Sequence, residues 1–319
     1  MNLNWIRGKK KMGRRRPQSS GEAIAGMLLL DKPAGITSNG ALQEAKRLLN
    51  ARKGGHTGSL DPIATGLLPL CFGSATKLSG FFLDADKKYW AKIRLGEATD
   101  TGDAEGTVLT SRPVGLTAAE VDMALDRFRG PILQTPPMYS AIKVNGQPLY
   151  KLAREGKEIE RQPRAVTVHE LELTAFEGRD LELNIDCSSG FYVRGLAHDL
   201  GERLGVGGHV VALRRVGVGT LKVSEAVTLQ ALLQMPDVAQ RRAVLIPPDR
   251  SLGHLPTVDL SVEAAFYLCR GQPVRANGLP ESGLVRLYAR DVGFLGIGNV
   301  TDDMQVAPRR LIVDTVKSA

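Results

Sequence analysis

The chain has 319 residues, of which 43% are hydrophobic, so it is long enough for one large globular domain or two. No apolar run approaches the ~18 residues of a membrane helix, and the charged N-terminus lacks the apolar segment of a secretory signal. The three cysteines are Cys71, Cys187 and Cys269. Because they are odd in number and far apart, they argue against a disulfide framework or a cysteine zinc site and suit a reducing cytoplasm.

The net charge of +8 is concentrated at one end of the chain. Residues 1–21 contain seven Lys and Arg and no Asp or Glu, so the rest of the chain is close to neutral. We interpret residues 1–25 as a basic disordered arm, because they are polar and without hydrophobic periodicity. The arm serves either solubility or a loose phosphate contact. A nucleic-acid site in the folded body must therefore be a local patch.

The first elements are a strand and a helix joined by a turn. Residues 27–30 predict a short buried strand, and the Asp-Lys-Pro-Ala-Gly sequence that follows predicts a turn. Thr37, Ser38 or Asn39 can cap a helix that runs to about Leu49.

A glycine- and proline-rich stretch comes next, at residues 54–69, with the sequence Gly-Gly-His-Thr-Gly-Ser-Leu-Asp-Pro-Ile-Ala-Thr-Gly-Leu-Leu-Pro. Its composition predicts a shaped loop rather than a helix or strand. The loop presents one imidazole, His56, and one carboxylate, Asp61, which Pro62 holds at a defined angle. The simpler interpretation is an Asx-type turn with His56 on the surface. The stretch lacks both the lysine of a phosphate loop and the glycine spacing of a dinucleotide site.

The next stretch predicts a helix at 75–83 and a strand at 88–95, in which Tyr89 shares a face with buried aliphatic residues. Tyr89 is therefore either a core aromatic or a ring that faces a ligand. Residues 99–106 gather three carboxylates, but not at the spacing of a calcium loop. We expect an exposed loop there.

Residues 136–166 differ in character from the chain around them. An Asn-Gly pair predicts a hairpin turn, and a short helix is expected after it. Tyr139 and Tyr150 lie among basic residues, which suits RNA backbone contact with base stacking. A solvated insertion would explain the same pattern. The six basic residues, against three glutamates, are Lys143, Lys151, Arg154, Lys157, Arg161 and Arg164.

Two strands are predicted at 166–176 and 181–187, and the alternation in the second indicates a half-buried antiparallel pair. Residues 188–194 then lead into a helix that ends near Leu204. Arg194 lies at the start of that helix, where the helix dipole disfavours a cation. We therefore expect a carboxylate partner nearby.

The last third of the chain begins with a glycine turn into a strand at 205–215. His209 has no partner at ligand spacing and is interpreted as a structural histidine, while Arg214 and Arg215 could serve phosphate or an ion pair. Residues 246–256 predict a linker from their Pro and Gly content. The final expected elements are a capped helix and three strands, at 261–270, 284–290, 293–300 and 305–313.

Residues 54–69 resemble the catalytic loop of the TruB-type tRNA pseudouridine synthases, and residues 26–39 resemble the opening motif of that family. The resemblance spans about residues 26–220, through four separated motifs in the expected order. It implies an α+β fold with a mixed, largely antiparallel sheet of the pseudouridine synthase type. It also implies a division into the arm at 1–25, a catalytic domain at 26–245 with a thumb insertion at 136–166, and a linker with a small β-rich PUA-like RNA-binding domain at 246–319.

The catalytic residues follow from the same resemblance. Asp61 matches the catalytic nucleophile of the family, and Arg194 matches the arginine that pairs with it. Tyr89 matches a tyrosine that stacks on the flipped base.

The remaining matches concern binding of the RNA base. His56 matches the histidine that helps to flip the target uridine out of its loop. Tyr192 and Leu213 match residues that line the uridine pocket.

The reaction that the resemblance implies is isomerisation of uridine to pseudouridine at position 55, in the T-loop of tRNA. Asp61 would either attack C1′ as a nucleophile or remove a proton from C2′ to give a glycal. The reaction has no redox or phosphoryl-transfer step, so we expect neither a metal nor another cofactor. The implied partner is the T-arm of tRNA, and we expect a cytoplasmic, monomeric enzyme with no membrane association.

Two alternatives remain from the sequence. One is an RNA-guided pseudouridine synthase of the box H/ACA type, which resembles this chain around the catalytic loop. The other is a tRNA-binding chaperone without catalysis. The presence of Asp61 favours an enzyme, and the basic insertion at 136–166 favours one that reads tRNA by itself.

Overall fold

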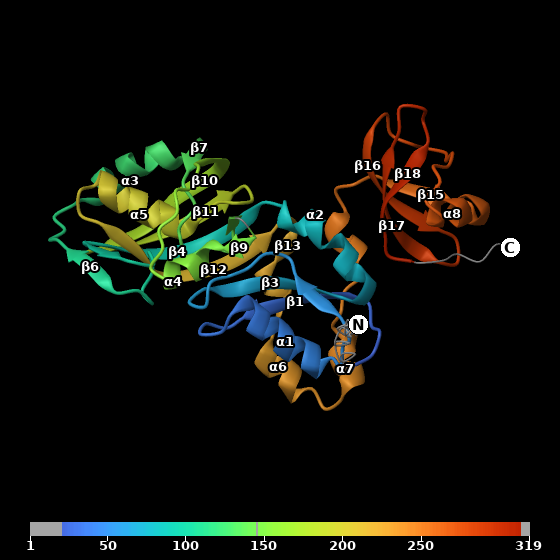
Figure 1. Ribbon diagram of the computed structural model, residues 1–319, viewed down its shortest axis with the longest axis horizontal. Coiled ribbons are helices and arrows are strands. Elements are labelled where there is room, and N and C mark those ends of the chain that lie inside the picture. The colour runs from blue at the N-terminus through green and yellow to red at the C-terminus, as the bar shows by residue number, and fades with distance from the viewer. Residues whose placement is uncertain (1–20, 145, 314–319) are drawn as a thin grey trace, which may run out of the picture.

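The structure of the protein is a computed structural model that describes residues 21–144 and 146–313. Figure 1 shows a wide twisted sheet with helices packed on it and a smaller β-rich unit, formed by the end of the chain, beside it. The predicted arm lies mostly outside the described residues. Glu22, predicted to belong to that arm, instead pairs with Ala51 in a β-bridge and forms an ion pair with Arg242. The folded chain therefore includes Glu22.

The large sheet has ten strands, eight of them in the order β14-β1-β3-β12-β4-β11-β10-β7, with β2 paired to β3 and β13 paired to β12. The pairs β1–β14 and β3–β12 are parallel, and the other pairs are antiparallel. The expected mixed, largely antiparallel sheet of an α+β fold is thus confirmed. Its strands are β1 (Gly26–Lys32), β2 (Gly54–His56), β3 (Thr65–Phe72), β4 (Lys87–Leu95), β7 (Gly130–Gln134), β10 (Arg164–Glu177), β11 (Asp180–Cys187), β12 (Gly208–Val218), β13 (Leu221–Lys222) and β14 (Val227–Thr228).

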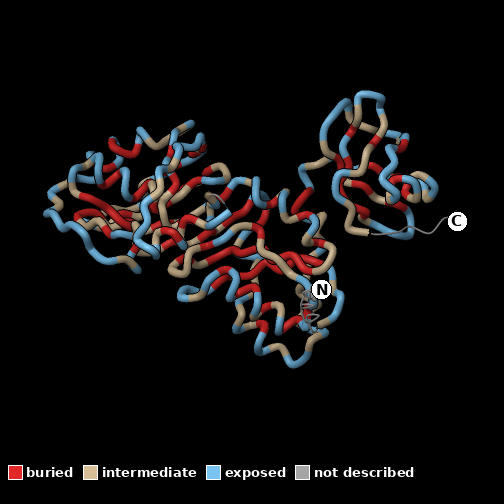
Figure 2. The backbone as a smooth tube through the Cα atoms, in the orientation of Figure 1, coloured by how far each residue is buried: buried red, intermediate tan, exposed pale blue. Residues whose placement is uncertain are grey.

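The hydrophobic patterns explain why these strands form and where the core lies. On β11 the apolar residues alternate inward, so that Leu181, Leu183, Ile185 and Cys187 are buried and pair with β4 and β10. Figure 2 shows the buried backbone concentrated in the strands. The helices that cover the sheet contribute their apolar faces to this core. They include α1 (Ser38–Leu48), α3 (Ala118–Leu125), α5 (Val193–Arg203) and α6 (Leu229–Gln234).

The glycine-rich stretch is more regular than its composition predicts. Gly54–His56 forms β2 and Thr65–Pro69 forms the start of β3, so only the residues between them form a loop. The expectation of a loop over all of 54–69 is therefore wrong at both ends. Pairing with neighbouring strands overrides the weak β propensity of glycine and proline.

Shorter elements join the large ones. The expected helix at 75–83 is a 3-10 helix, η1 (Gly73–Leu78), continued by α2 (Ser79–Leu83). The insertion at 136–166 contains a small hairpin and a helix, as expected, and Asn145 of its turn lies outside the described residues. The remaining short elements are β5 (Glu97–Thr99), β6 (Val108–Ser111), η2 (Asp126–Phe128), β8 (Lys143–Val144), β9 (Gln147–Pro148), α4 (Leu149–Arg154), η3 (Val223–Glu225), α7 (Val238–Ala243) and η4 (Pro248–Leu252).

The end of the chain forms a four-stranded sheet in the order β15-β16-β17-β18, with its own cluster of buried residues. Residues 246–256 lead into it, but they are not a free linker. Ile246 pairs with Met27 of β1, and Leu252 is buried in a cluster shared by the two sheets. The elements of this unit are β15 (Thr257–Leu260), α8 (Val262–Cys269), β16 (Gly283–Ala289), β17 (Gly293–Val300) and β18 (Val306–Leu311).

Among the described residues, no helix is both long and apolar enough to cross a membrane.

Candidate active site

Asp61 lies on the loop between β2 and β3, and a buried lysine supports that loop. The side chain of Lys32 is fully buried at the end of β1. Its Nζ donates to the carbonyl oxygens of Pro33 (2.9 Å), Ile36 (2.8 Å) and Pro62 (3.3 Å). Burial lowers the pKa of Lys32 from 10.5 to about 8, against the opposing charge of Asp61. Lys32 therefore fixes the backbone that directly follows Asp61.

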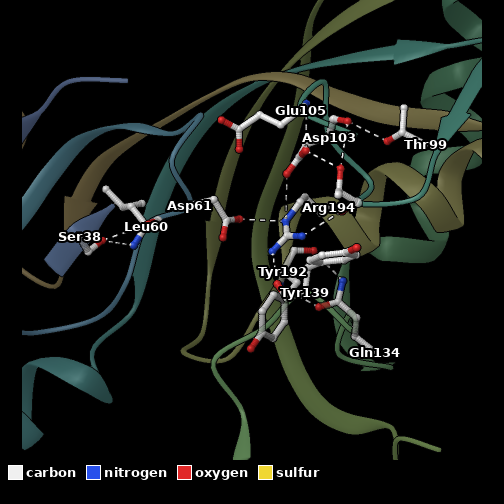
Figure 3. A network of polar contacts seen from close by, with 11 residues as sticks. Ser38, Leu60, Asp61, Thr99, Asp103, Glu105, Gln134, Tyr139, Tyr192 and Arg194 are labelled. Carbon is white, nitrogen blue, oxygen red and sulfur yellow. Dashed lines mark hydrogen bonds and ion pairs between the residues drawn. The ribbon is translucent and has the colours of Figure 1, made fainter. Parts of the chain in front are cut away.

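Two more buried side chains hold the same loop. The Ser38 hydroxyl accepts from the Leu60 N–H (2.7 Å) and donates to the Leu60 carbonyl (3.0 Å), as Figure 3 shows. The Arg215 guanidinium, only 1% exposed, donates to the carbonyl oxygens of Gly58 (3.2 Å) and Ser59 (3.5 Å). The loop is thus held through its main chain, which leaves the Asp61 carboxylate free to make other contacts.

The loop enters β3 at a close crossing with β12. Only two residue pairs join these strands, Arg214 with Thr65 and Arg215 with Gly66. Gly66 has φ +99°, and a Cβ there would lie 2.3 Å from the Arg215 carbonyl oxygen. Any side chain would force the strands apart, so glycine is required. Arg214 extends outward to form a bidentate ion pair with Asp31.

Arg194 is the centre of the polar network in Figure 3. Its side chain is 5% exposed, and its Nε lies 2.9 Å from Asp61 Oδ2 and 3.8 Å from Asp103 Oδ2. Its Nη1 donates to the Thr101 carbonyl (2.9 Å) and its Nη2 to the Tyr139 carbonyl (2.7 Å). The carboxylate partner expected for an arginine at a helix start is therefore present. These contacts fix the guanidinium on several sides.

The environment of Asp61 raises its pKa above the ordinary value. Burial is the largest cause, and the nearby charge of Asp103 adds to it, while Arg194 and Lys32 oppose both. The side chain nevertheless remains 38% exposed, far more than Arg194 or Asp103. A carboxylate of raised basicity that reaches solvent can act on a bound ligand as a nucleophile or base.

The segment 99–106 corrects one expectation. Asp103 is only 3% exposed, so the segment is not simply an exposed loop. Its backbone hydrogen-bonds to Val210 of β12, which carries it over the start of α5. Asp103 Oδ1 accepts from the Thr101 hydroxyl (2.6 Å) and the Glu105 N–H (3.1 Å), and Oδ2 turns toward Arg194. The sequence did not place Asp103 in the site.

Tyr89 lies on β4 directly opposite Arg215 of β12. Burial raises the pKa of the Tyr89 phenol, and Arg215 opposes this effect. Two positions along the ladder, Leu213 pairs with Ala91, and Leu213 is 8% exposed. Tyr89 and Leu213 therefore lie on the paired strands β4 and β12, and β12 also pairs with β3 where the Asp61 loop ends.

His56 lies on β2, opposite Leu70 of β3. Burial lowers the pKa of His56, and the positive charge of Arg215 lowers it further, so the neutral ring is favoured. Within the described part of the chain, its buried Nδ1 has no hydrogen-bond partner. A buried polar atom without a partner is unusual in folded proteins, and this one lies on the strand that leads into the Asp61 loop.

Tyr192 immediately precedes α5, and its backbone is held by a buried amide. Gln134 Nε2 donates to the Tyr192 carbonyl (2.9 Å), and the Tyr192 N–H donates to Gln134 Oε1 (2.8 Å). Burial raises the pKa of the Tyr192 phenol, and the neighbouring Ser140 hydroxyl opposes this. The site therefore also includes the first residues of the insertion at 136–166.

Family models match nearly all of the folded chain. A model described as "TruB family pseudouridylate synthase (N terminal domain)" matches residues 46–193. Models described as "tRNA pseudouridylate synthase B C-terminal domain" and "Pseudouridine synthase II TruB, C-terminal" match residues 194–252 and 256–312. The tRNA pseudouridine synthase B of Stutzerimonas stutzeri is 51% identical over 292 residues, which cover 91% of this chain and 96% of that protein. The chain belongs to the TruB family of pseudouridylate synthases.

Other relatives agree with this assignment. The tRNA pseudouridine synthase B of Serratia proteamaculans is 48% identical and covers 94% of this chain and 98% of its own length. Among solved structures, a chain of a Cbf5-Nop10-Gar1 complex aligns with a TM-score of 0.69 and 25% identity, covering 90% of this chain and 85% of that one. A chain of an H/ACA RNP bound to a substrate RNA aligns with the same TM-score at 22% identity, which supports the fold.

The structure of this TruB-family chain adds site residues that sequence reasoning did not single out. Lys32 appeared only as part of a turn, and Asp103 only as one of three loop carboxylates. Gln134 carried no signal, because a single glutamine at the end of a strand is unremarkable in sequence. Arg215 was expected to contact phosphate or form an ion pair, whereas its contacts are main-chain carbonyl oxygens.

Proposed function

We propose that this TruB-family protein isomerises uridine 55 in the T-loop of tRNA to pseudouridine, with Asp61 as the reacting group. One observation carries the proposal: Arg194 holds two carboxylates, and of these two only Asp61 reaches solvent. The family membership and the names of the relatives support tRNA as the substrate and pseudouridylation as the reaction.

The chemistry requires the C1′–N1 bond to break and a C1′–C5 bond to form. Asp61 either attacks C1′, so that uracil leaves with the electron pair at N1, or removes the C2′ proton to give a glycal and free uracil. In both routes the uracil rotates while it is held in the site. In the first route C5 then attacks C1′ and displaces the Asp61 carboxylate, and in the second C5 bonds to C1′ of the glycal while Asp61 returns its proton to C2′. The C5 proton is then lost to solvent. Arg194 keeps Asp61 ionised and directs it at the sugar.

Base binding requires the target uridine to leave its stack. In our proposal Tyr89 stacks on the flipped uracil, and Tyr192 and Leu213 close the pocket against water that would trap an intermediate. His56 assists flipping through its neutral ring, whose buried Nδ1 has no hydrogen-bond partner among the described residues.

We further propose that the insertion at 136–166 is a thumb that grips the T-arm. Its basic residues Lys143, Lys151 and Arg154 are exposed, and the Arg154 guanidinium lies 5.6 Å from the centre of the Tyr150 ring. Tyr139, at the base of the thumb, contacts Arg194 through its carbonyl oxygen. RNA bound by a thumb in this position would lie close to the Asp61 carboxylate.

The domain division also belongs to the proposal. We place the boundary near residue 256 rather than 246, because Leu252 packs in a cluster with Met27 and Leu29 of β1. The unit after it would act as a small PUA-like RNA-binding domain, and the protein would work as a cytoplasmic monomer without a metal or other cofactor.

The test is a reconstitution from pure components. The purified protein is incubated with unmodified tRNA transcript and no other RNA, and pseudouridine is mapped by position. We expect modification at uridine 55 alone, and none in a transcript that carries cytidine there. Activity that appears only after a guide RNA is added would favour the RNA-guided alternative, and tRNA binding without any pseudouridine would favour the chaperone.

A further inference from the structure

Gln134 is a buried amide at the junction between the thumb and the active site. It is the last residue of β7, two positions before the thumb begins, and it is 3% exposed. In the β7–β10 ladder it pairs with Arg164, where the chain returns from the thumb. Gln134 therefore ends the strand from which the thumb leaves and lies opposite the first residue of the strand to which it returns.

The two hydrogen bonds of this amide converge on one residue. Its Nε2 donates to the Tyr192 carbonyl at 2.9 Å, and its Oε1 accepts from the Tyr192 N–H at 2.8 Å (Figure 3). Contacts to both the N–H and the C=O fix the peptide planes on both sides of Tyr192. Because Tyr192 is the N-cap of α5, the amide sets the direction in which that helix starts.

The packing of Gln134 against α5 leaves no space for adjustment. A Cβ on Gly195 would lie 2.8 Å from Gln134 Nε2, so the amide rests directly on the backbone of the first helical turn. Arg194 belongs to the same turn, and its Nε is 2.9 Å from Asp61. A change in the start of α5 would therefore displace Arg194 from Asp61 and Tyr192 from the pocket.

We propose that Gln134 is a positioning residue for the reaction at Asp61. It holds Tyr192 and Arg194 in the productive geometry and ties that geometry to the strands that carry the thumb. The inference rests on the proposed function, because it names a further residue on which that reaction depends.

This position requires one donor and one acceptor, and an amide supplies both at every pH. An ionised glutamate has acceptors alone, so its second oxygen would face the Tyr192 carbonyl and repel it. A protonated glutamic acid can donate to that carbonyl and still accept from the Tyr192 N–H. Burial favours the protonated form by raising its pKa. A glutamate at this position would therefore regain the wild-type contacts as the pH falls.

The experiment compares Gln134→Leu, Gln134→Glu and the surface control Gln43→Glu with the wild type. Single-turnover rates are measured with saturating tRNA across a range of pH, together with tRNA affinity and thermal unfolding at each pH. We expect Gln134→Leu to react ~10- to 100-fold more slowly, the range expected for a misplaced catalytic group, with nearly unchanged affinity. The rate of Gln134→Glu relative to wild type should rise as the pH is lowered, whereas that of Gln43→Glu should not change.

A second readout does not depend on activity. In protein with ¹⁵N-labelled tyrosine, hydrogen exchange of the Tyr192 N–H should be faster in Gln134→Leu than in wild type and slow in Gln134→Glu, which keeps an acceptor. If the wild type makes no pseudouridine, the proposed function fails, and this exchange still decides whether Gln134 holds Tyr192. The positioning proposal is overturned if Gln134→Leu reacts at the wild-type rate, or if the Gln134→Glu rate ratio is independent of pH while that variant remains folded. Unchanged Tyr192 exchange in Gln134→Leu would also overturn it.

Discussion

The Asp61 loop rests on three buried side chains, Lys32, Ser38 and Arg215, whereas the thumb rests on little buried surface. Each of the three side chains binds main-chain atoms of the loop, so the backbone on both sides of Asp61 is fixed. In the thumb hairpin and helix, Leu149 and Leu152 are the buried residues among those described, and most others are exposed.

This difference separates two requirements of the proposed reaction. Chemistry needs a carboxylate held at a defined position, and buried hydrogen bonds to the main chain supply that rigidity. Gripping RNA needs accessible cations, and a segment with few buried contacts can adjust to its partner. Variants should therefore affect chemistry at one region and affinity at the other.

The largest effect is expected in the Asp61 loop, from Asp61→Asn. The variant keeps the shape of the side chain but removes the charge that reacts with the sugar, so turnover should fall to the detection limit. Affinity for tRNA, measured by filter binding, should stay within a few-fold of wild type because the thumb is unchanged. Turnover close to the wild-type rate would show that Asp61 is not the reacting group.

The thumb should show the opposite pattern. Replacing residues 143–159 with a short Gly-Ser turn keeps Tyr139 and Ser140 in the site but removes most of the exposed cations. Each lost phosphate contact should reduce the slope of log affinity against log salt by ~0.7–0.9, while the single-turnover rate at saturating tRNA is preserved.

A charge-only control separates the two contributions of the thumb. Lys151→Gln combined with Lys157→Gln keeps the shape and should lower the salt slope without changing the preference for the T-arm. If the shortened thumb binds tRNA with unchanged affinity and salt slope, residues 136–166 are a solvated insertion instead.

Substitutions of Tyr89 test whether the active site also binds the uracil base. Tyr89→Phe keeps the ring and should bind tRNA nearly as well as wild type. Tyr89→Leu should lose about 1–3 kcal/mol of binding free energy, the contribution of one base–aromatic stack, and should react more slowly. Equal affinities and rates for the two variants, by titration and single turnover, would argue against stacking.

The smallest effect concerns Lys32 and appears as a pH dependence of stability. Lys32→Met leaves three carbonyl oxygens without their donor and should lower the free energy of unfolding by about 1–3 kcal/mol at neutral pH. Burial lowers the pKa of Lys32 from 10.5 to about 8, so the folded protein loses this proton before the unfolded chain does. The Lys32 contribution to stability should therefore increase as the pH rises from about 8 to 10.5.

Denaturant unfolding across that pH range measures the difference between wild type and Lys32→Met, which cancels the titration of other groups. The exposed Lys222→Met serves as the matched control and should show neither the loss nor the pH dependence. A difference that stays constant with pH would mean that burial does not shift the pKa of Lys32.

Most local elements of this protein can be predicted from short stretches of its sequence. Alternation of apolar residues located β4 and β11, and the possible cap residues at 37–39 and at 261 located the starts of α1 and α8 to within a few positions. A helix cap depends on contacts within the helix, and apolar alternation depends on which side of the strand is buried. Both patterns are therefore visible in residues that are neighbours in the sequence. The resemblance in residues 54–69 also indicated Asp61 as a candidate, because the whole motif lies in one continuous stretch of sequence.

Contacts between side chains from distant segments could not be predicted in this way. Asp103 looked like a member of an exposed acidic loop, and it became buried because the loop backbone pairs with Val210. Gln134 precedes Tyr192 by 58 positions, and Arg215 follows the Asp61 loop by more than 150. Hydrogen bonds over such separations depend on the order and register of the strands, because these set the positions of both partners. Strand order and register cannot be read from the residues next to Gln134 or Arg215 in the sequence.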